Sequence, residues 1–145
     1  MTRAACVLLF LAPALLADDK KPDAKTETAA IKGKWKVTAT KYNGKDVPLS
    51  DGRVLVFDEK EFTAFEGAKK GRTLGFTLDP TTEPKRLDLT LPGSDQKVAG
   101  IYILDGDSLK LCYGEPGTER PKKLESKADE KVFLLVLERV KPQRP

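Results

Sequence analysis

Apolar and polar residues alternate along short segments through most of the chain after Gly33. Within the segment Arg72–Asp79, for example, Leu74, Phe76 and Leu78 are separated by glycine or threonine. A period of two places the apolar side chains on one face of an extended strand and the polar side chains on the other. The pattern is typical of antiparallel strands that bury one face.

Eight segments carry this alternation, and turn sequences separate them. Asn43-Gly44, Asp79-Pro80 and Pro92-Gly93 favour turns, and Asp105-Gly106-Asp107 is typical of a hairpin. A short segment, Lys123–Glu125, is a candidate for a ninth strand at an edge. Because no long helical pattern interrupts them, these segments predict an all-β fold, either a meandering antiparallel barrel or a sandwich. The eight segments are Gly33–Thr40, Arg53–Asp58, Glu61–Phe65, Arg72–Asp79, Arg86–Leu91, Val98–Leu104, Leu109–Tyr113 and Val132–Val140.

The alternation also predicts which side chains face the core. The first strand is expected to bury Trp35, Val37 and Ala39 and to expose the residues that alternate with them, through Thr40. In the other strands, aromatic and branched side chains share the inward parity. The predicted inward-facing residues are Trp35, Val37, Leu55, Phe57, Phe62, Leu74, Phe76, Leu78, Leu87, Leu89, Tyr102, Leu104, Leu109, Leu111, Tyr113, Phe133, Leu135 and Leu137.

The first seventeen residues have the parts of a secretory signal sequence. A short positive start, Met1 to Arg3, precedes an uncharged run from Ala4 to Leu16, and charged residues follow Ala17 at once. As a helix this run would span roughly 20 Å, less than the roughly 30 Å hydrocarbon core of a membrane. We therefore expect residues 1–17 to be cleaved, with an uncleaved anchor as the alternative. The mature protein is then exported, periplasmic or extracellular, with no stable membrane span.

Cleavage determines the rest of the domain organisation. Residues 18–31 are charged and poor in apolar side chains, which predicts a flexible tether with at most one helical turn, at Thr28–Lys32. The folded domain is expected over residues 32–141, and a short tail over residues 142–145. Cleavage also removes Cys6 and leaves Cys112 as the single cysteine, so an intramolecular disulfide is excluded and pairing with another chain stays open.

The chain of 145 residues contains no histidine, which excludes several kinds of catalytic site. Ser-His-Asp and Cys-His nucleophiles, histidine-ligated zinc and imidazole proton transfer all need this residue. The excess of 26 Lys and Arg residues over 22 Asp and Glu residues is small, and the two kinds are interleaved rather than aligned in a basic stripe. We therefore expect a protein that is not an enzyme, carries no cofactor and does not bind nucleic acid.

Three short motifs that look like reactive sites are better explained as turns or strand positions. Ser94 and Lys97 have an S-x-x-K spacing, but they follow a Pro-Gly turn between strands, where the lysine is solvated and charged. Asp105 and Asp107 offer two carboxylates, fewer than the roughly six to eight oxygen ligands of a calcium site. Cys112 has no histidine to activate it. No catalytic or metal-binding residue is therefore predicted.

The first and last strands carry a pair of residues suited to close one end of the fold. Gly33 allows a tight turn into the first strand, and Trp35 offers a large apolar surface. Arg139 shares the parity of the core leucines in the last strand, and an inward arginine needs a partner. A guanidinium over the indole face contributes roughly 0.5 to 2 kcal/mol. We expect Gly33, Trp35 and Arg139 to close one end, and the alternative is a core tryptophan with an unrelated, exposed arginine.

An ordered set of short motifs extends from Gly33 to Arg139. They are Gly33-Lys34-Trp35-Lys36-Val37, Leu78-Asp79-Pro80, Pro84-Lys85, Leu87-Asp88-Leu89, Gly100-Ile101-Tyr102, the run from Leu104 to Tyr113, Pro116-Gly117 and Arg120-Pro121. Gly-x-Trp on the first strand with an arginine on the last is similar to the lipocalin pattern. More closely, the chain resembles a family of small secreted lipocalin-like domains, abundant in planctomycete bacteria, that has no established activity. The resemblance implies an all-β, antiparallel up-and-down barrel of eight strands, or nine with the edge segment.

Two functions fit such a barrel, because an eight-stranded barrel is either filled by side chains or holds one small ligand. By analogy with the fold, we expect a small hydrophobic ligand inside the barrel, with Tyr102, Tyr113 and Phe76 as candidate contacts. The alternative is a structural or interaction domain with a filled barrel, whose loops, above all Gly114–Lys131, contact another envelope protein. A cavity well below about 300 Å³ would count against a ligand.

Overall fold

The computed structural model describes residues 23–49 and 52–141. The predicted signal peptide, the first part of the predicted tether and the predicted tail therefore lie outside the described residues. One helix and nine strands are present in the described ranges. These elements are α1 (Ala24–Ile31), β1 (Gly33–Tyr42), β2 (Lys45–Asp46), β3 (Arg53–Phe57), β4 (Glu61–Glu66), β5 (Lys69–Asp79), β6 (Lys85–Thr90), β7 (Lys97–Asp105), β8 (Ser108–Gly114) and β9 (Val132–Arg139).

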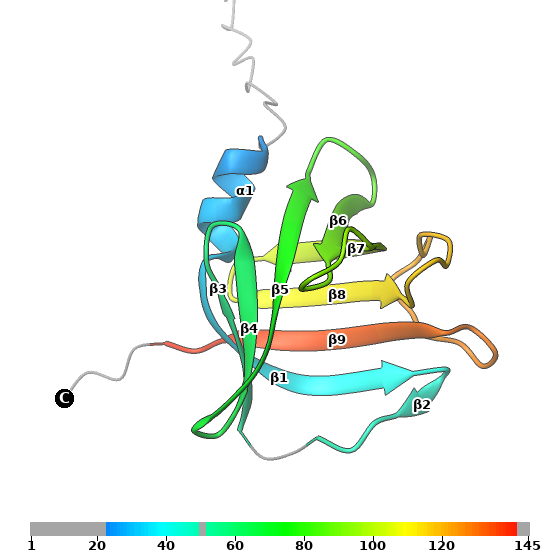
Figure 1. Cartoon of the computed structure of the whole chain (residues 1–145), viewed down its shortest axis with the longest axis horizontal. Helices are drawn as coiled ribbons and strands as arrows, with labels where there is room; N and C mark the ends of the chain where they lie inside the picture. Colours follow the sequence, from blue (N-terminus) through cyan, green and yellow to red (C-terminus); the bar gives the residue numbers. More distant parts are fainter. Residues whose placement is uncertain (1–22, 50–51, 142–145) are drawn as a thin grey trace, which may run out of the picture.

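Eight of the strands form a closed antiparallel barrel (Figure 1). From β3 to β9 each strand pairs with the next one along the chain, and β1 pairs with both β3 and β9. The pairing of β1 with β9 closes the sheet, which leaves the barrel without a long open edge. The predicted all-β, up-and-down barrel is therefore confirmed, and the sandwich alternative is wrong.

The ninth strand is not the one that the sequence predicts. β2 is a two-residue strand that pairs with the last two residues of β1, whereas Lys123–Glu125 has no strand structure. The carbonyls of Lys123 and Glu125 instead accept hydrogen bonds from the Cys112 thiol, with S···O distances of 3.5 and 3.7 Å. The segment is therefore a loop that contacts the outward side of β8 through Cys112.

This segment belongs to the outer loop, residues 115–131, which connects β8 to β9. The loop is bound to the barrel by Arg120, whose Nη1 donates to the carbonyl of Gly100 at 2.7 Å and whose Nη2 pairs with Asp88 Oδ1 at 2.7 Å. Cys112 and its register partner Ile101 have outward parity, yet both are buried. The outer loop therefore adds a small layer of packing outside the barrel.

The inward-facing residues predicted from the alternation form the core, and each of them lies in the hydrophobic cluster or packs against it. Phe57 stacks on Phe62 with ring centroids 5.0 Å apart and meets Phe76 edge-on at 5.4 Å. Two further core residues, Ile31 of α1 and Val98 of β7, are outside the predicted set. A period of two is therefore a sufficient guide to the core of most strands.

One prediction within β1 is wrong because of a β-bulge. Val37 pairs with Leu137 but Ala39 pairs with Val136, so β1 carries one extra residue at this point. The bulge shifts the alternation by one residue, and beyond it Thr40 rather than Ala39 is buried. A bulge of this kind bends its strand, which fits the double role of β1 as the partner of both β3 and β9.

Helix α1 begins earlier than the single turn predicted at Thr28–Lys32. Asp23 caps the helix, because its side chain accepts a hydrogen bond from the backbone N–H of Thr26 at 2.8 Å. Ile31, at the other end, is fully buried. Capping and tertiary packing stabilise a short helix more than its own propensity does, so residues 24–31 of the predicted tether are helical. Within the described ranges, no helix is long and apolar enough to cross a membrane.

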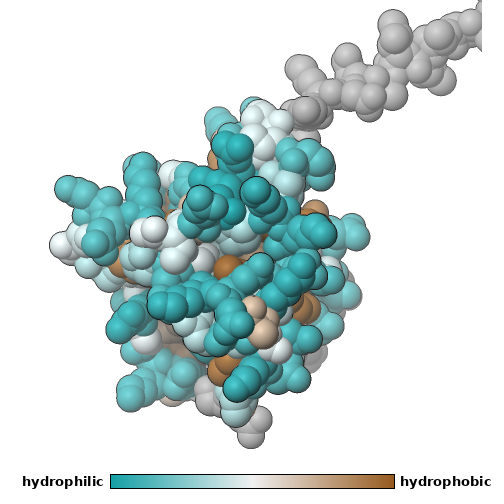
Figure 2. All heavy atoms as spheres, turned by 90° about the vertical axis from the view of Figure 1, so that its right-hand side faces the viewer, coloured by the Kyte–Doolittle hydropathy of each residue, from teal (hydrophilic) through white to brown (hydrophobic). Residues whose placement is uncertain are grey.

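The outer surface offers little apolar area. Figure 2 shows one face of the molecule, on which small hydrophobic areas are separated by hydrophilic side chains. Among the described residues, the exposed large hydrophobic side chains are Ile103 and Val140. The apolar surface that a ligand can use is therefore concentrated inside the barrel.

Candidate functional site

One end of the barrel is closed by α1 (Figure 1), and side chains from β1 and β9 hold the helix there. The indole Nε1 of Trp35 donates to the carbonyl of Ile31 at 2.7 Å. The Arg139 guanidinium donates to the carbonyls of Lys32 and Ala30 at 3.1 and 2.5 Å. The last carbonyls of a helix have no partners within it, so these two side chains satisfy them and attach the helix to the barrel.

The predicted contact between Trp35 and Arg139 is present. The two residues are register partners in β1 and β9, and the guanidinium carbon of Arg139 lies 4.3 Å from the ring centroid of Trp35. Gly33 has a φ of +128°, and a Cβ at this position would lie 3.2 Å from Nη1 of Arg139. Asp107 completes the group with an ion pair to Nε of Arg139 at 3.3 Å. The alternative of an unrelated, exposed arginine is therefore wrong.

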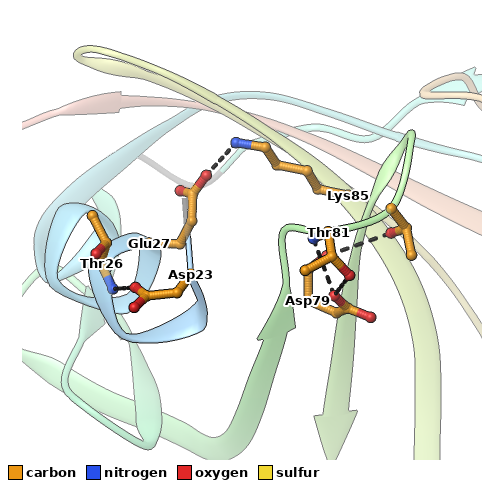
Figure 3. Close-up of polar contacts among 7 residues, drawn as sticks. Asp23, Thr26, Glu27, Asp79, Thr81 and Lys85 are labelled. Carbon is orange, nitrogen blue, oxygen red and sulfur yellow. Dashed lines mark hydrogen bonds and ion pairs between the residues drawn. The ribbon is translucent and has the colours of Figure 1, made fainter. Parts of the chain in front are cut away.

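A second attachment of α1 is an ion pair inside the closed end. Glu27 is 5% exposed, and its carboxylate pairs with the ammonium of Lys85 at the start of β6. Figure 3 shows these two side chains pointing toward each other from the helix and the strand. Asp79 is engaged separately, because it accepts hydrogen bonds from the hydroxyl and the amide of Thr81, which lower the pKa of its carboxyl. Both carboxylates therefore already have protein partners.

Two of the three candidate ligand contacts, Tyr102 and Phe76, lie in the closed half of the barrel. Tyr102 is fully buried, and burial raises the pKa of its hydroxyl, which has no hydrogen-bond partner among the described residues. The ammonium of Lys85 lies 6.0 Å from the centroid of its ring. Phe76 packs edge-on against Phe57 in the core. Neither Tyr102 nor Phe76 lines the cavity at the other end.

The other end of the barrel holds a cavity of about 630 Å³. It lies where β3 and β9 begin and where β6 and β8 end, and its volume is within the roughly 300–1,000 Å³ range of ligand pockets. Tyr113 is the one candidate ligand contact among its lining residues. The apolar part of the wall is formed by Leu55, Phe62, Ala64, Leu74, Leu89, Leu91, Val98, Leu111, Pro116, Phe133 and Leu135.

Tyr113 belongs to an aromatic stack beside this cavity. Its ring stacks on Phe133 with centroids 5.4 Å apart, and Phe133 stacks on Tyr42 at 4.3 Å. Burial raises the pKa of Tyr113, while the positive charge of Arg53 acts in the opposite direction. The hydroxyl of Tyr42 donates to the carboxylate of Glu115, which raises the pKa of Tyr42. Both phenols are therefore protonated at neutral pH, and Glu115 already has a partner.

Charged side chains gather at the mouth of the cavity. Arg53, Lys69 and Arg72 bring positive charge, and Glu66 and Glu115 bring negative charge. None of the ion pairs in the described part of the chain includes Arg53, Lys69 or Arg72. The Nε atom of Arg53 is buried and has no hydrogen-bond partner among the described residues. The mouth therefore holds a guanidinium whose Nε has no hydrogen-bond partner among the described residues.

Sequence reasoning missed Arg53, although the sequence carries a signal for it. Arg53 has the parity of the buried Leu55, and the same argument singles out Arg139 in the last strand. Arg72 carries the same signal, because it has the parity of Leu74 in the predicted strand Arg72–Asp79. Lys69 carries none, since it precedes that strand and lies beyond an irregular pairing between β4 and β5. Parity thus identifies an inward charge, but only the pairing shows which charges meet at the mouth.

The three motifs considered for reactivity lie outside the cavity wall. The Ser94 hydroxyl accepts a hydrogen bond from the amide of Gln96 at 3.1 Å in the turn between β6 and β7. Cys112 is buried, and burial raises the pKa of its thiol to about 11. Asp107 pairs with Arg139 at the closed end. In residues 23–49 and 52–141, no three His, Cys, Asp or Glu side chains are grouped so that they could hold a metal ion.

The chain was compared with protein-family models, with curated proteins and with solved structures. None of the three comparisons found a match. The resemblance to secreted lipocalin-like domains therefore rests on the sequence motifs alone.

Proposed function

We propose that the protein is an exported, non-catalytic binding domain that holds one small apolar molecule inside its barrel. The observation that carries the proposal is the cavity of about 630 Å³ with its mainly aliphatic and aromatic wall. A barrel of eight strands that is filled by side chains leaves no space of this size. Export rests on the signal sequence predicted over residues 1–17, and the resemblance to secreted lipocalin-like domains supports the same location.

The two ends of the barrel have different roles in this proposal. α1, Trp35 and Arg139 close one end through hydrogen bonds to backbone carbonyls. The mouth, in contrast, is bordered by the exposed side chains of Lys69 and Arg72, which are long and can move aside. A ligand therefore enters at the mouth and can reach Phe62, which lines the cavity and stacks on Phe57 of the core.

The alternative, an interaction domain with a filled barrel, has less support. It needs an interior without space for a ligand, and the cavity volume is about twice the lower limit for ligand pockets of about 300 Å³. Its expected contact surface is the outer loop, and that loop is bound to the barrel itself through Arg120 and through the carbonyls that accept from Cys112.

Binding of the neutral apolar fluorophore N-phenyl-1-naphthylamine tests the proposal. The wild-type protein is expected to raise the fluorescence of the probe to saturation at one probe per chain, because the wall of the cavity excludes water. Ala64→Phe is expected to abolish this signal, since Ala64 lines the cavity and a phenyl ring there takes the space of the ligand.

Ala39→Phe provides the matched control. It makes the same change in another strand of the barrel, but Ala39 does not line the cavity and has outward parity beyond the bulge in β1. This variant is expected to bind the probe as the wild type does. The proposal fails when the wild type gives no saturable signal, or when Ala64→Phe binds the probe as tightly as the wild type.

A further inference from the structure

We infer that the ligand is an amphiphile whose anionic head group, a carboxylate or a phosphate, is bound by Arg53 at the mouth while its apolar chain lies in the barrel. The inference rests on the proposed function, because it names the chemical class of the molecule that the cavity holds. Its main observation is that Arg53 lines the cavity with a buried Nε that has no hydrogen-bond partner in the described residues.

A buried, unpartnered donor on a charged group is unfavourable, because the donor has lost its hydrogen bonds to water and gained none in return. Arg53 is held in this position by its strand, since it has the same parity as Leu55 and Phe57, which face the core. The ion pairs found among the described residues all involve other side chains. An anionic atom of a ligand would supply the acceptor that the described residues do not.

The other charges at the mouth leave Arg53 available to a ligand. Lys69 and Arg72 are exposed and add positive charge around it. Glu66 is the register partner of both Arg53 and Lys69, but it is exposed and takes part in none of the ion pairs found in the described residues. Glu115 already accepts a hydrogen bond from a tyrosine. The three cations therefore outnumber the two carboxylates, of which one is engaged.

The position of Arg53 along the cavity also fits an amphiphile better than a wholly apolar molecule. Arg53 begins β3 at the mouth, and Leu55 follows it two residues further into the barrel. When the head group of a ligand is bound to Arg53, its apolar chain therefore lies directly against the apolar wall of the cavity. The guanidinium can donate two parallel hydrogen bonds to a carboxylate or a phosphate, whereas a cationic head group would be repelled by all three basic side chains.

Displacement of N-phenyl-1-naphthylamine by dodecyl compounds tests the inference, because these ligands share one chain and differ in the head group. Dodecanoate and dodecyl phosphate, used below the concentrations at which they form micelles, are expected to bind at least about tenfold more tightly than 1-dodecanol. The anion with the higher affinity indicates the source of the ligand: a fatty acid if it is dodecanoate, and a phosphate-bearing lipid if it is dodecyl phosphate.

Two variants that each lose one positive charge test whether the preference for anionic head groups depends on Arg53. Arg53→Met is expected to remove the preference for the anions while 1-dodecanol binds within about twofold of its wild-type affinity, which also shows that the variant is folded. Lys70→Met is the matched control, because Lys70 lies near the mouth but pairs with the outward Phe65 and does not line the cavity. This control is expected to keep the preference.

Each contrary result has a separate meaning. If 1-dodecanol binds as tightly as the two anions, the head-group inference is wrong while the proposed function stands. If Lys70→Met loses the preference as fully as Arg53→Met does, the effect belongs to the general charge of the mouth and the assignment to Arg53 is wrong. If neither the probe nor any dodecyl compound binds, the proposed function fails as well.

Discussion

Two arginines of this protein have inward parity, and they differ in how many partners the described residues give them. Arg139 lies at the closed end of the barrel, and Arg53 lies at the mouth of the cavity. Arg139 lies on the ring of Trp35, donates to two carbonyls at the end of α1 and pairs with Asp107. Arg53 shares the same kind of parity, but its Nε has no partner among the described residues. A satisfied guanidinium stabilises the fold, whereas an unsatisfied one at the mouth of a cavity is a group that a ligand can use.

Arg139→Ala is expected to lower the free energy of unfolding by about 2 kcal/mol, since it removes a cation–π contact and hydrogen bonds to the helix. The emission of Trp35 is expected to shift to longer wavelength, because the indole loses its cover. Urea unfolding followed by fluorescence measures both effects. Lys141→Ala removes an exposed cation that also pairs with Asp107, and it is the control that should change neither quantity. If Arg139→Ala also leaves both unchanged, the contact contributes nothing to stability.

Residue parity predicted the core well but could not distinguish the candidate ligand contacts. Tyr102 and Tyr113 both face inward, yet Tyr102 lies in the closed half and only Tyr113 lines the cavity. Parity tells whether a side chain faces the inside of a barrel, and it carries no information about depth along the barrel axis. Depth depends on strand register, which is set by pairs far apart in the sequence.

At the scale of the elements, local patterns fail where a distant partner decides the conformation. α1 has a polar sequence, and its attachment depends on Trp35, Arg139 and Lys85, all in strands of the barrel. The bulge in β1 lies just beyond the residues that pair with β3, in the part of the strand that pairs with β9. The outer loop at Lys123–Glu125 is held by Cys112 instead of forming the strand that was predicted.

Cys112 connects β8 to the outer loop, and its thiol gives this contact a pH dependence. Burial raises the pKa of the thiol from 9.0 to about 11, because the thiolate is unfavourable under the loop. The folded state therefore favours the neutral thiol. This contribution to stability is fully present below about pH 9 and is lost as the pH rises toward about 11.

We accordingly expect the difference in unfolding free energy between the wild type and Cys112→Ala to be constant from pH 7 to pH 9 and to shrink between pH 9 and pH 11. Denaturant unfolding of both proteins across this range measures it, and the alanine variant corrects for other groups that titrate at high pH. A difference that is the same at pH 7 and pH 11 contradicts the proposed burial of the thiol.

At the scale of the whole molecule, the barrel is packed at one end and hollow at the other. Phe57 and Phe76 pack together in the closed half, and Phe62 stacks on Phe57 while it also lines the cavity. The open half leaves about 630 Å³ unfilled. Empty apolar volume reduces stability, because the side chains around it lack packing partners. The unliganded protein is therefore less stable than a fully packed barrel would be, and the missing contacts lie where a ligand is proposed to bind.

Ala64→Phe is expected to raise the free energy of unfolding by roughly 0.5 to 2 kcal/mol in the absence of ligand, because the new ring fills part of the cavity. Thermal unfolding of the unliganded variant and wild type measures the gain. Combined with the expected loss of probe binding, this result shows that binding and stability compete for the same space. A marked loss of stability instead means that the space around Ala64 cannot accept a ring.

The sequence by itself determined eight of the nine strands, most of their inward faces, the meandering antiparallel order and the pairing of Trp35 with Arg139. These features follow from alternation, turn residues and the need of an inward charge for a partner, which are local or nearly local properties. Only the tertiary structure decided where the cavity lies, that Tyr113 rather than Tyr102 reaches it and that the Nε of Arg53 has no partner among the described residues at its mouth. Those features depend on register between strands and on the volume that packed side chains leave empty, and neither quantity can be read along one strand.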